Sequence, residues 1–232
     1  MKTKLMLLII ATFFTFSCSQ DETIKLSQDN ANKEVANFTY KGIEYSSSFI
    51  IENNDIRILD PKINEIYQTI LDLPELAILV YSENKVEFFD NYQELTKAQT
   101  NNNLKNIKQT PNTRIITERQ NWGTLELFKD ANYTGRKLTF TFSTNNYEIG
   151  NLCDYDFNDD MSSFRIHNSK TNIYRVTFFA DAFYQGRSIS FSPGSADFYE
   201  VYYMGMRFSG SLWWQKDWND TVTSFKIDTM PN

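Results

Sequence analysis

The chain has 232 residues, of which 41% are hydrophobic and 16% aromatic, and a formal net charge of −6. This acidic balance disfavours nucleic acid as a partner and favours cations or basic partners. The single histidine excludes a multi-histidine metal centre, and the two cysteines allow at most one disulfide.

Residues 1–17 are predicted to be a signal segment rather than part of a fold. Lys2 and Lys4 precede an apolar run at residues 5–14, which is shorter than the roughly 20 residues of a membrane-spanning helix. The segment ends in Thr-Phe-Ser-Cys at Cys18, which resembles the lipobox of bacterial lipoproteins. The resemblance implies cleavage before Cys18 and attachment of lipid to it. An ordinary signal peptide that is cleaved elsewhere is the alternative.

A lipid on Cys18 would anchor the chain to a membrane and leave Cys153 without a partner for an intramolecular disulfide. Residues 18–36 are polar and almost free of aromatic residues, as expected for a flexible tether. Asp21 and Glu22 resemble the surface-export signal of some Gram-negative lipoproteins. We therefore expect an outer-membrane lipoprotein of the bacterial cell envelope that is exposed at the surface.

Residues 37–96 are expected to form a small α+β domain. Strand-like segments occupy residues 38–59, and a helix is predicted over 61–73, begun by Pro61 and capped by Asp60. The apolar residues of this helix fall on one face, namely Ile63, Ile66, Tyr67, Ile70 and Leu71.

Residues 76–81 and 85–89 are predicted to form a strand hairpin, followed by a short capped helix at 90–95. No paired carboxylates, nucleophile with a base or phosphate loop in this domain indicates a function. Residues 97–114, rich in Asn, Gln, Thr and Lys, are expected to be a linker. Residues 115–232 alternate aromatic and β-branched residues between frequent turns, which predicts an all-β sandwich or barrel.

Two similar octets occur in this second domain, Phe-Asn-Asp-Asp-Met-Ser-Ser-Phe at 157–164 and Trp-Asn-Asp-Thr-Val-Thr-Ser-Phe at 218–225. Upstream of each lies a second shared pattern, an aromatic residue, four residues, an aromatic residue, one residue and then Gly-Arg. Its positions are Phe128, Tyr133, Gly135 and Arg136 in one copy and Phe179, Tyr184, Gly186 and Arg187 in the other. The glycine suits a hairpin folded back on its own sheet, because such a turn needs positive φ. The chain therefore contains an internal repeat.

This double pattern resembles the βγ-crystallin family, with two complete Greek-key motifs over residues 122–229. The resemblance implies that the motifs pair into one β-sandwich and that the octets cross over to build two calcium sites. The implied ligands are the side chains of Asn158, Asp159 and Ser162 with the carbonyl of Asp160, and those of Asn219, Asp220 and Thr223 with the carbonyl of Thr221. The serines that end the polar runs, Ser163 and Ser224, are implied to bond to the folded hairpins.

The chemistry of the octets also agrees with calcium. Ca²⁺ takes roughly six to eight oxygen ligands, and carboxylate, amide, hydroxyl and carbonyl groups supply only oxygen. Few full charges per site predict a Kd on the order of 10⁻⁶ to 10⁻³ M. For either octet alone, the alternative is a polar turn in which Asn and Asp bond to nearby backbone.

The second motif is longer than the first, with 38 residues from Gly186 to Ser224 against 28 from Gly135 to Ser163. The extra residues lie in the aromatic-rich stretch 195–218. Exposed rings there would bind a glycan, with Trp213, Trp214, Tyr202 and Tyr203 as the candidates, whereas buried rings would extend the core.

Catalysis is not indicated by the sequence. His167 lacks an evident orienting partner, and a Cys153–His167 dyad is disfavoured because Cys153 is expected to be a small buried apolar residue. We expect a non-enzymatic, lipid-anchored envelope protein that binds two Ca²⁺ and serves a structural or adhesive role. The alternatives are a glycan-binding accessory lipoprotein that uses the aromatic residues of 198–218, and a protease inhibitor, because βγ-crystallin-like folds serve that role.

Overall fold

The computed structural model describes residues 34–52, 55–82, 85–102, 121–143, 146–194, 196–205 and 217–230. The predicted signal segment with Cys18 lies outside these residues, as do Trp213 and Trp214 of the aromatic stretch.

Residues 34–102 combine strands and helices, which confirms the predicted α+β composition. Strands β1 (Glu34–Tyr40), β2 (Ile43–Glu52) and β3 (Asp55–Ile58) pair as an antiparallel meander. Strands β4 (Ala77–Ser82) and β5 (Lys85–Phe89) form the predicted hairpin. Helix α1 (Pro61–Leu71) precedes this hairpin, and helix α2 (Tyr92–Asn102) follows it.

Helix α1 begins where the sequence predicts. The Asp60 carboxylate accepts hydrogen bonds from the backbone N–H groups of Lys62 and Ile63 at 2.9 and 3.1 Å. These bonds satisfy two of the donors that a helix N-terminus leaves free. Tyr67 and Ile70 are fully buried, so the predicted apolar face packs into the core.

Helix α2 is longer than the predicted short helix and continues into the stretch expected to be a linker. Asn91 Oδ1 accepts a hydrogen bond from Glu94 N at 3.0 Å and so caps its first turn. Leu95 is fully buried in a cluster with residues of the β4–β5 hairpin, and Ala98, in the stretch expected to be a linker, packs partly buried against the same cluster. This packing favours the helix beyond its predicted end. No helix in the described part of the chain is long and apolar enough to cross a membrane.

The repeat folds as two sets of four strands. The first motif contains β6 (Gly123–Asp130), β7 (Thr134–Phe142), β8 (Tyr147–Ile149) and β9 (Ser163–His167). The second contains β10 (Ile173–Asp181), β11 (Gln185–Phe191), β12 (Phe198–Val201) and β13 (Ser224–Met230). Short 3-10 turns occupy Ala131–Tyr133 (η1), Leu152–Tyr155 (η2) and Ala182–Tyr184 (η3).

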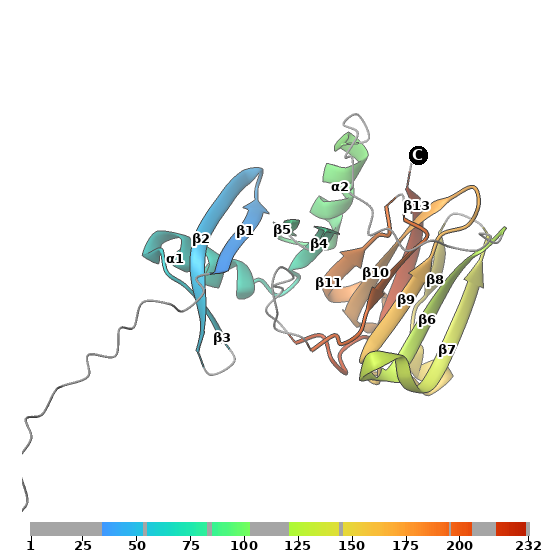
Figure 1. Cartoon of the computed structure of the whole chain (residues 1–232). Coiled ribbons are helices and arrows are strands. Elements are labelled where there is room, and N and C mark those ends of the chain that lie inside the picture. The colour runs from blue at the N-terminus through green and yellow to red at the C-terminus, as the bar shows by residue number, and fades with distance from the viewer. Residues whose placement is uncertain are drawn as a thin grey trace, which may run out of the picture. The chain divides into compact units, whose positions relative to one another are not determined.

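Figure 1 shows β6, β7 and β9 in one layer and β10, β11 and β13 in the other. Each motif gives its third strand to the sheet of the other motif. One sheet has the order β12-β9-β6-β7, and the other contains the run β11-β10-β13-β8. Strand β12 pairs with β9, and β8 pairs with β13, both antiparallel. The exchange produces two interlocked Greek keys, which is the sandwich expected from the repeat.

Aromatic residues of both sheets fill the sandwich core. Phe164 of one sheet lies 4.9 Å from Phe178 and 5.0 Å from Phe191 of the other, measured between ring centroids, and all three are fully buried. Phe157 and Trp218, which open the two octets, are also fully buried. Both octets are therefore fixed to the core at their first residue.

The second sheet of the sandwich continues into the α+β segment through β11 and β4. These strands pair in parallel, with Ser188–Phe191 opposite Ala77–Val80. Ser188 N also donates a hydrogen bond to Leu76 O at 2.8 Å. In the described residues the complete sheet has the order β3-β2-β1-β5-β4-β11-β10-β13-β8. The two segments on either side of residues 97–114 therefore share one hydrogen-bonded sheet.

Candidate metal sites between the two octets

A folded hairpin precedes each octet. In both hairpins three residues have positive φ, Asn132, Tyr133 and Gly135 in the first and Phe183, Tyr184 and Gly186 in the second. A Cβ atom on Gly135 would collide with the Asp130 carboxylate, and one on Gly186 would collide with that of Asp181. The turn therefore needs glycine both for its φ and for the space beside it.

The last serine of each polar run fastens the hairpin of its own motif. Ser163 Oγ donates to Asp130 O at 2.7 Å and accepts from Tyr133 N at 3.1 Å. Ser224 Oγ makes the equivalent bonds to Asp181 O and from Tyr184 N, again at 2.7 and 3.1 Å. Both serines thus bond to the hairpins, as the repeat implies.

The two octets lie against each other and exchange backbone hydrogen bonds. Asp159 N donates to Val222 O at 3.3 Å, and Asp220 N donates to Met161 O at 3.2 Å. Asp159 and Asp220 have φ of 51° and 50°, a left-handed conformation that Asp adopts more readily than most residues. The equivalent bonds relate the two octets by an approximate two-fold symmetry.

The side chains cross between the octets in the same way. Thr223 Oγ1 donates to Asp159 Oδ1 at 3.0 Å, and Ser162 Oγ donates to Asp220 Oδ1 at 3.4 Å. Each contact joins the carboxylate of one octet to the hydroxyl of the other. We refer to them as the Asp159–Thr223 pair and the Asp220–Ser162 pair.

The asparagine before each aspartate supports its carboxylate. Asn158 Nδ2 donates to Asp159 Oδ2, and Asn219 Nδ2 donates to Asp220 Oδ2, both at 2.6 Å. Asn219 Oδ1 is buried and has no hydrogen-bond partner among the described residues. A buried oxygen without a donor is costly, so this atom is an acceptor that a cation would satisfy.

The atoms around both pairs that could bind a metal ion are oxygen atoms. The fourth residue of each octet adds a carbonyl oxygen, from Asp160 or Thr221, to which no described residue donates a backbone hydrogen bond. The described residues contain no group of three or more His, Cys, Asp or Glu that could hold a metal ion. A set of neutral oxygens with few carboxylates fits a hard cation such as Ca²⁺ better than a transition metal.

Negatively charged side chains surround the Asp220–Ser162 pair. Burial raises the pKa of Asp220, and the carboxylates of Asp160 and Asp217 raise it further, while the Ser162 hydroxyl and Lys129 act in the opposite direction. Lys129 Nζ forms an ion pair with Asp160 Oδ2 at 3.0 Å. Asp160 and Asp217 therefore add negative charge near the Asp220–Ser162 pair, and Lys129 partly neutralises it.

The arginine of each Gly-Arg pattern holds the backbone just before the octet, a role that the sequence interpretation missed. Arg136 donates to Asp156 O and Tyr155 O at 2.8 and 2.7 Å. Arg187 donates to Asp217 O at 3.0 Å. The folded hairpin explains the glycine of the repeated Gly-Arg dipeptide but not its arginine. The repeated arginine is therefore the sequence signal for this role.

These arginines also lie near the aromatic residues that open the octets. The guanidinium carbon of Arg136 lies 5.8 Å from the ring centroid of Phe157, and that of Arg187 lies 4.9 Å from the ring centroid of Trp218. Asp217 has a second role, because its carboxylate accepts a hydrogen bond from Asn219 N at 2.9 Å. Each octet is thus held at its beginning by an arginine and at its end by a serine.

The described part of the aromatic stretch belongs partly to the core. Strand β12 lies in the sandwich, and Tyr199 stacks on Phe191 at 5.7 Å between centroids. Tyr203 is half-buried, whereas Tyr202 is 43% exposed. Trp213 and Trp214 fall outside the described residues, so glycan binding at these rings stays a prediction.

The histidine and the cysteine of the fold have separate surroundings. His167 stacks on Phe198 with 5.4 Å between ring centroids, and burial lowers its pKa. Cys153 is exposed, so the expectation of a buried apolar cysteine is wrong. In the η2 turn it is Leu152 that points into the core, which leaves the next residue at the surface.

Comparison with protein families and curated proteins gives one partial match. The sequence model of peptidase inhibitor family I36 matches residues 123–191, less than a third of the chain. This segment contains the first octet and ends before the second. No curated protein matches the chain.

Nine solved chains are similar to part of this chain. A βγ-crystallin from Ciona intestinalis is 20% identical, with 46% of this chain and 99% of that chain covered and a TM-score of 0.31. A double mutant of a βγ-crystallin domain from Clostridium beijerinckii is 21% identical, with 45% and 96% covered and a TM-score of 0.29. A βγ-crystallin from an archaeon is 15% identical, with 47% and 98% covered and a TM-score of 0.29.

The geometry of residues 121–230 itself defines the fold. The exchanged third strands, the two folded hairpins and the crossed octets together make a βγ-crystallin-like Greek-key sandwich. The fold implied by the repeat is therefore confirmed.

Proposed function

We propose that the βγ-crystallin-like sandwich binds two Ca²⁺ ions between its octets. The observation that carries this proposal is the crossed arrangement of side chains, in which each carboxylate meets the hydroxyl of the other octet at 3.0 or 3.4 Å. Polar turns serving only their own strands would need bonds within one octet. The unpartnered Asn219 Oδ1 adds an acceptor that a cation would use.

In this proposal each ion takes ligands from both motifs. Asp159, Thr223 and the carbonyl of Thr221 would hold one ion, and Asp220, Ser162 and the carbonyl of Asp160 the other. Asn158 and Asn219 would contribute through their amide oxygens. Such ions would link the two Greek keys only in the folded state, and each site would add about 2.7 kcal/mol at a hundredfold excess of Ca²⁺ over Kd.

Calcium calorimetry on the full chain tests the proposal. The wild-type chain should bind two ions, Ser162→Arg and Thr223→Arg should each bind one, and the double variant should bind none. The calcium-dependent rise in Tm should disappear with the second site. Thr141→Arg, at an exposed position on β7, is the control and should keep both ions. A wild-type chain that binds no Ca²⁺ would contradict the proposal.

We also propose that the chain serves a structural or adhesive, non-enzymatic role at the bacterial cell envelope, anchored through lipid on Cys18. The support is the lipobox-like Thr-Phe-Ser-Cys after an apolar run. Growth of expressing cells with labelled palmitate should label the wild-type chain and leave Cys18→Ala unlabelled. An unlabelled wild-type chain would contradict lipid anchoring.

A second candidate function is peptidase inhibition, which the match of the I36 family model to residues 123–191 favours. The test is the residual activity of serine, cysteine and metallopeptidases after incubation with excess chain. Inhibition that persists in the Ser162→Arg, Thr223→Arg double variant would assign this function independently of calcium. Full activity across the panel would remove the candidate.

A further inference from the structure

The two octets differ in charge at their fourth residue, which is Asp160 in the first and Thr221 in the second. Both residues are proposed to give a backbone carbonyl to calcium, but only Asp160 also carries a carboxylate. Lys129 Nζ donates to Asp160 Oδ2 at 3.0 Å and forms an ion pair with it. A charged carboxylate beside one proposed calcium site is therefore already bound to a cation of the chain itself.

The second motif lacks both members of this ion pair. Lys129 follows the first aromatic residue of the repeated Gly-Arg pattern, and the second motif has Ala180 at that position. Thr221 replaces Asp160, and its hydroxyl donates to Asn219 O at 3.0 Å within its own octet. The pair therefore distinguishes two sites that are otherwise built from the same kinds of residue.

The backbone fixes Lys129 beside the first octet. Ser162 N donates to Phe128 O at 3.0 Å, so the residue that follows Phe128 is tied to the Asp220–Ser162 pair. The lysine charge also acts on Asp220, whose pKa is raised by burial and lowered by Lys129. The side chains of Lys129 and Asp160 are 50% and 30% exposed, so both can move without disturbing the core.

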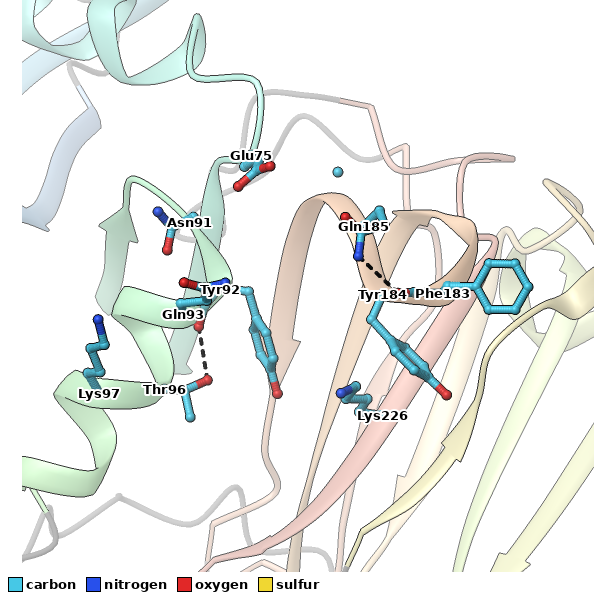
Figure 2. Close-up of a pocket in the computed structure, with 11 residues that line it drawn as sticks. Glu75, Asn91, Tyr92, Gln93, Thr96, Lys97, Phe183, Tyr184, Gln185 and Lys226 are labelled. Atoms are coloured by element: carbon cyan, nitrogen blue, oxygen red, sulfur yellow. Dashed lines mark hydrogen bonds between the residues drawn. The ribbon is translucent and has the colours of Figure 1, made fainter.

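The lysine on β13 of the second motif takes a different place. Lys226 corresponds in the repeat to Arg165 rather than to Lys129. Its Nζ lies 4.1 Å from the ring centroid of Tyr184 and 3.6 Å from Glu148 Oε2. Figure 2 shows Lys226 beside Tyr184, near helix α2. Its charge is therefore paired with a carboxylate outside the octets.

A lysine ammonium and Ca²⁺ compete for the same kind of ligand. Ca²⁺ binds carboxylate oxygens, so a free Asp160 side chain would add negative charge, or a ligand, to the Asp220–Ser162 site. Lys129 neutralises that carboxylate and repels an approaching cation. Because the ion pair as a whole is close to neutral, removing one partner alone should change the site, and removing both should not.

We propose that Lys129 lowers the calcium affinity of the Asp220–Ser162 site by holding the Asp160 carboxylate as a built-in counter-ion. This inference rests on the proposed function and adds to it a residue that sets the affinity of one site only. At the equivalent places beside the other site, Ala180 and Thr221 carry no charge. The chain therefore has two calcium sites whose affinities are set separately.

Calorimetric titration of the full chain with Ca²⁺ tests each site by itself. Thr223→Arg leaves the Asp220–Ser162 site, and Ser162→Arg leaves the Asp159–Thr223 site. Adding Lys129→Met to Thr223→Arg should lower the Kd of the remaining ion roughly three- to tenfold. Adding it to Ser162→Arg should leave the Kd unchanged. In the otherwise wild-type chain, Lys129→Met should tighten one of the two ions, which tests the inference even if the arginine variants do not fold.

Two further changes separate charge from a structural role of the lysine. Lys129→Arg keeps the charge and should keep the Kd of its parent chain. Asp160→Asn keeps the backbone carbonyl and should raise the Kd of the Thr223→Arg chain, because Lys129 then lacks its counter-ion. Combining Asp160→Asn with Lys129→Met should restore the Kd of that parent. NaCl at about 0.5 M should reduce the effects of both single changes, since the two groups are partly exposed.

Lys137→Met is the matched control. Lys137 Nζ pairs with Glu126 Oε1 at 2.7 Å, its side chain is 46% exposed, and neither residue is a proposed ligand. This change should leave both Kd values unchanged. An unchanged Kd for Lys129→Met in Thr223→Arg, whose single ion is still bound, would overturn this inference alone. So would an equal gain in Ser162→Arg or with Lys137→Met. A wild-type chain that binds no Ca²⁺ would overturn the proposed function together with it.

Discussion

Asp220 carries a negative charge that the surrounding side chains only partly compensate. Burial, Asp160 and Asp217 raise its pKa, so the folded chain holds this proton more tightly than the unfolded chain does. Stability without calcium therefore falls as the pH rises from the ordinary aspartate pKa through the raised pKa of the folded state. A bound cation would remove this penalty by neutralising the charge.

Asp220→Asn removes the ionisation while keeping the shape of the side chain. In calcium-free buffer the Tm of the variant should fall less than the Tm of the wild type across this pH interval. At pH values above the interval, the variant should melt at a higher temperature than the wild type. Excess Ca²⁺ should reverse the order by stabilising the wild type. Asp154→Asn in η2 is the control for removal of a surface charge. The same pH dependence in Asp220→Asn and wild type would contradict the argument.

Glycine is required in the folded hairpins for two reasons, which substitutions can separate. Gly186 has φ of 72° and a side-chain carboxylate where a Cβ would lie, whereas Gly42 has φ of 76° and open space. Gly186→Ala should therefore lower the free energy of unfolding by about 1–3 kcal/mol, and by more than Gly42→Ala does. Urea unfolding of both variants measures the difference. Equal losses would mean that Asp181 moves aside without cost.

At the scale of elements, each octet acts as a loop fixed at both ends. Its first residue is buried and lies close to an arginine, and its serine bonds to the hairpin. The second octet supplies Asp220 to one pair and Thr223 to the other. Displacement of this loop should therefore affect both calcium sites together.

Arg187→Met tests this coupling by removing the bond to Asp217 O while keeping an apolar stem beside Trp218. Both calcium affinities should fall several-fold, with the stoichiometry still two. Arg187→Lys should recover part of the loss, because lysine keeps the charge but not the planar fork. Arg57→Met on β3 serves as the control in the same calorimetry. Loss of a single site with the other unchanged would show that the arginine does not position the whole loop.

Local sequence signals predicted most elements, because the interactions that define them are local. The Asp60 cap and Pro61 begin α1, and the hairpin glycines have the positive φ that their spacing implies. The length of α2 was not predictable in this way. Its second half is polar apart from Ala98, which packs against the buried cluster of Leu95 and the β4–β5 hairpin, and such a tertiary contact cannot be read from the local pattern.

At the scale of the molecule, the pairing of β4 with β11 joins the α+β segment to the sandwich. Nothing in the residues of either strand specifies this partner, because parallel pairing depends on distant contacts rather than on local pattern. The calcium octets were accessible because they are repeated.

A shared sheet predicts that residues 34–230 unfold together. Differential scanning calorimetry should show one transition, and Ca²⁺ should raise its midpoint. Hydrogen exchange should show added protection in β4 as well as in the octets when calcium binds. Two transitions, with calcium shifting only one of them, would show that the segments on either side of residues 97–114 fold as independent domains.

The central claim is that the two octets build their calcium sites across each other. The most direct test is the calcium stoichiometry of two double variants that share Ser162→Arg. Glycine is the right replacement for the aspartates, because Asp159 and Asp220 both have positive φ. Each variant should first be shown to fold by its cooperative melt.

Ser162→Arg combined with Asp220→Gly changes two groups of one crossed pair, so the chain should still bind one Ca²⁺. Ser162→Arg combined with Asp159→Gly damages both pairs, so the chain should bind none. The reverse result, no ion in the first variant and one in the second, would mean that each octet binds calcium within itself, and it would contradict the crossed arrangement.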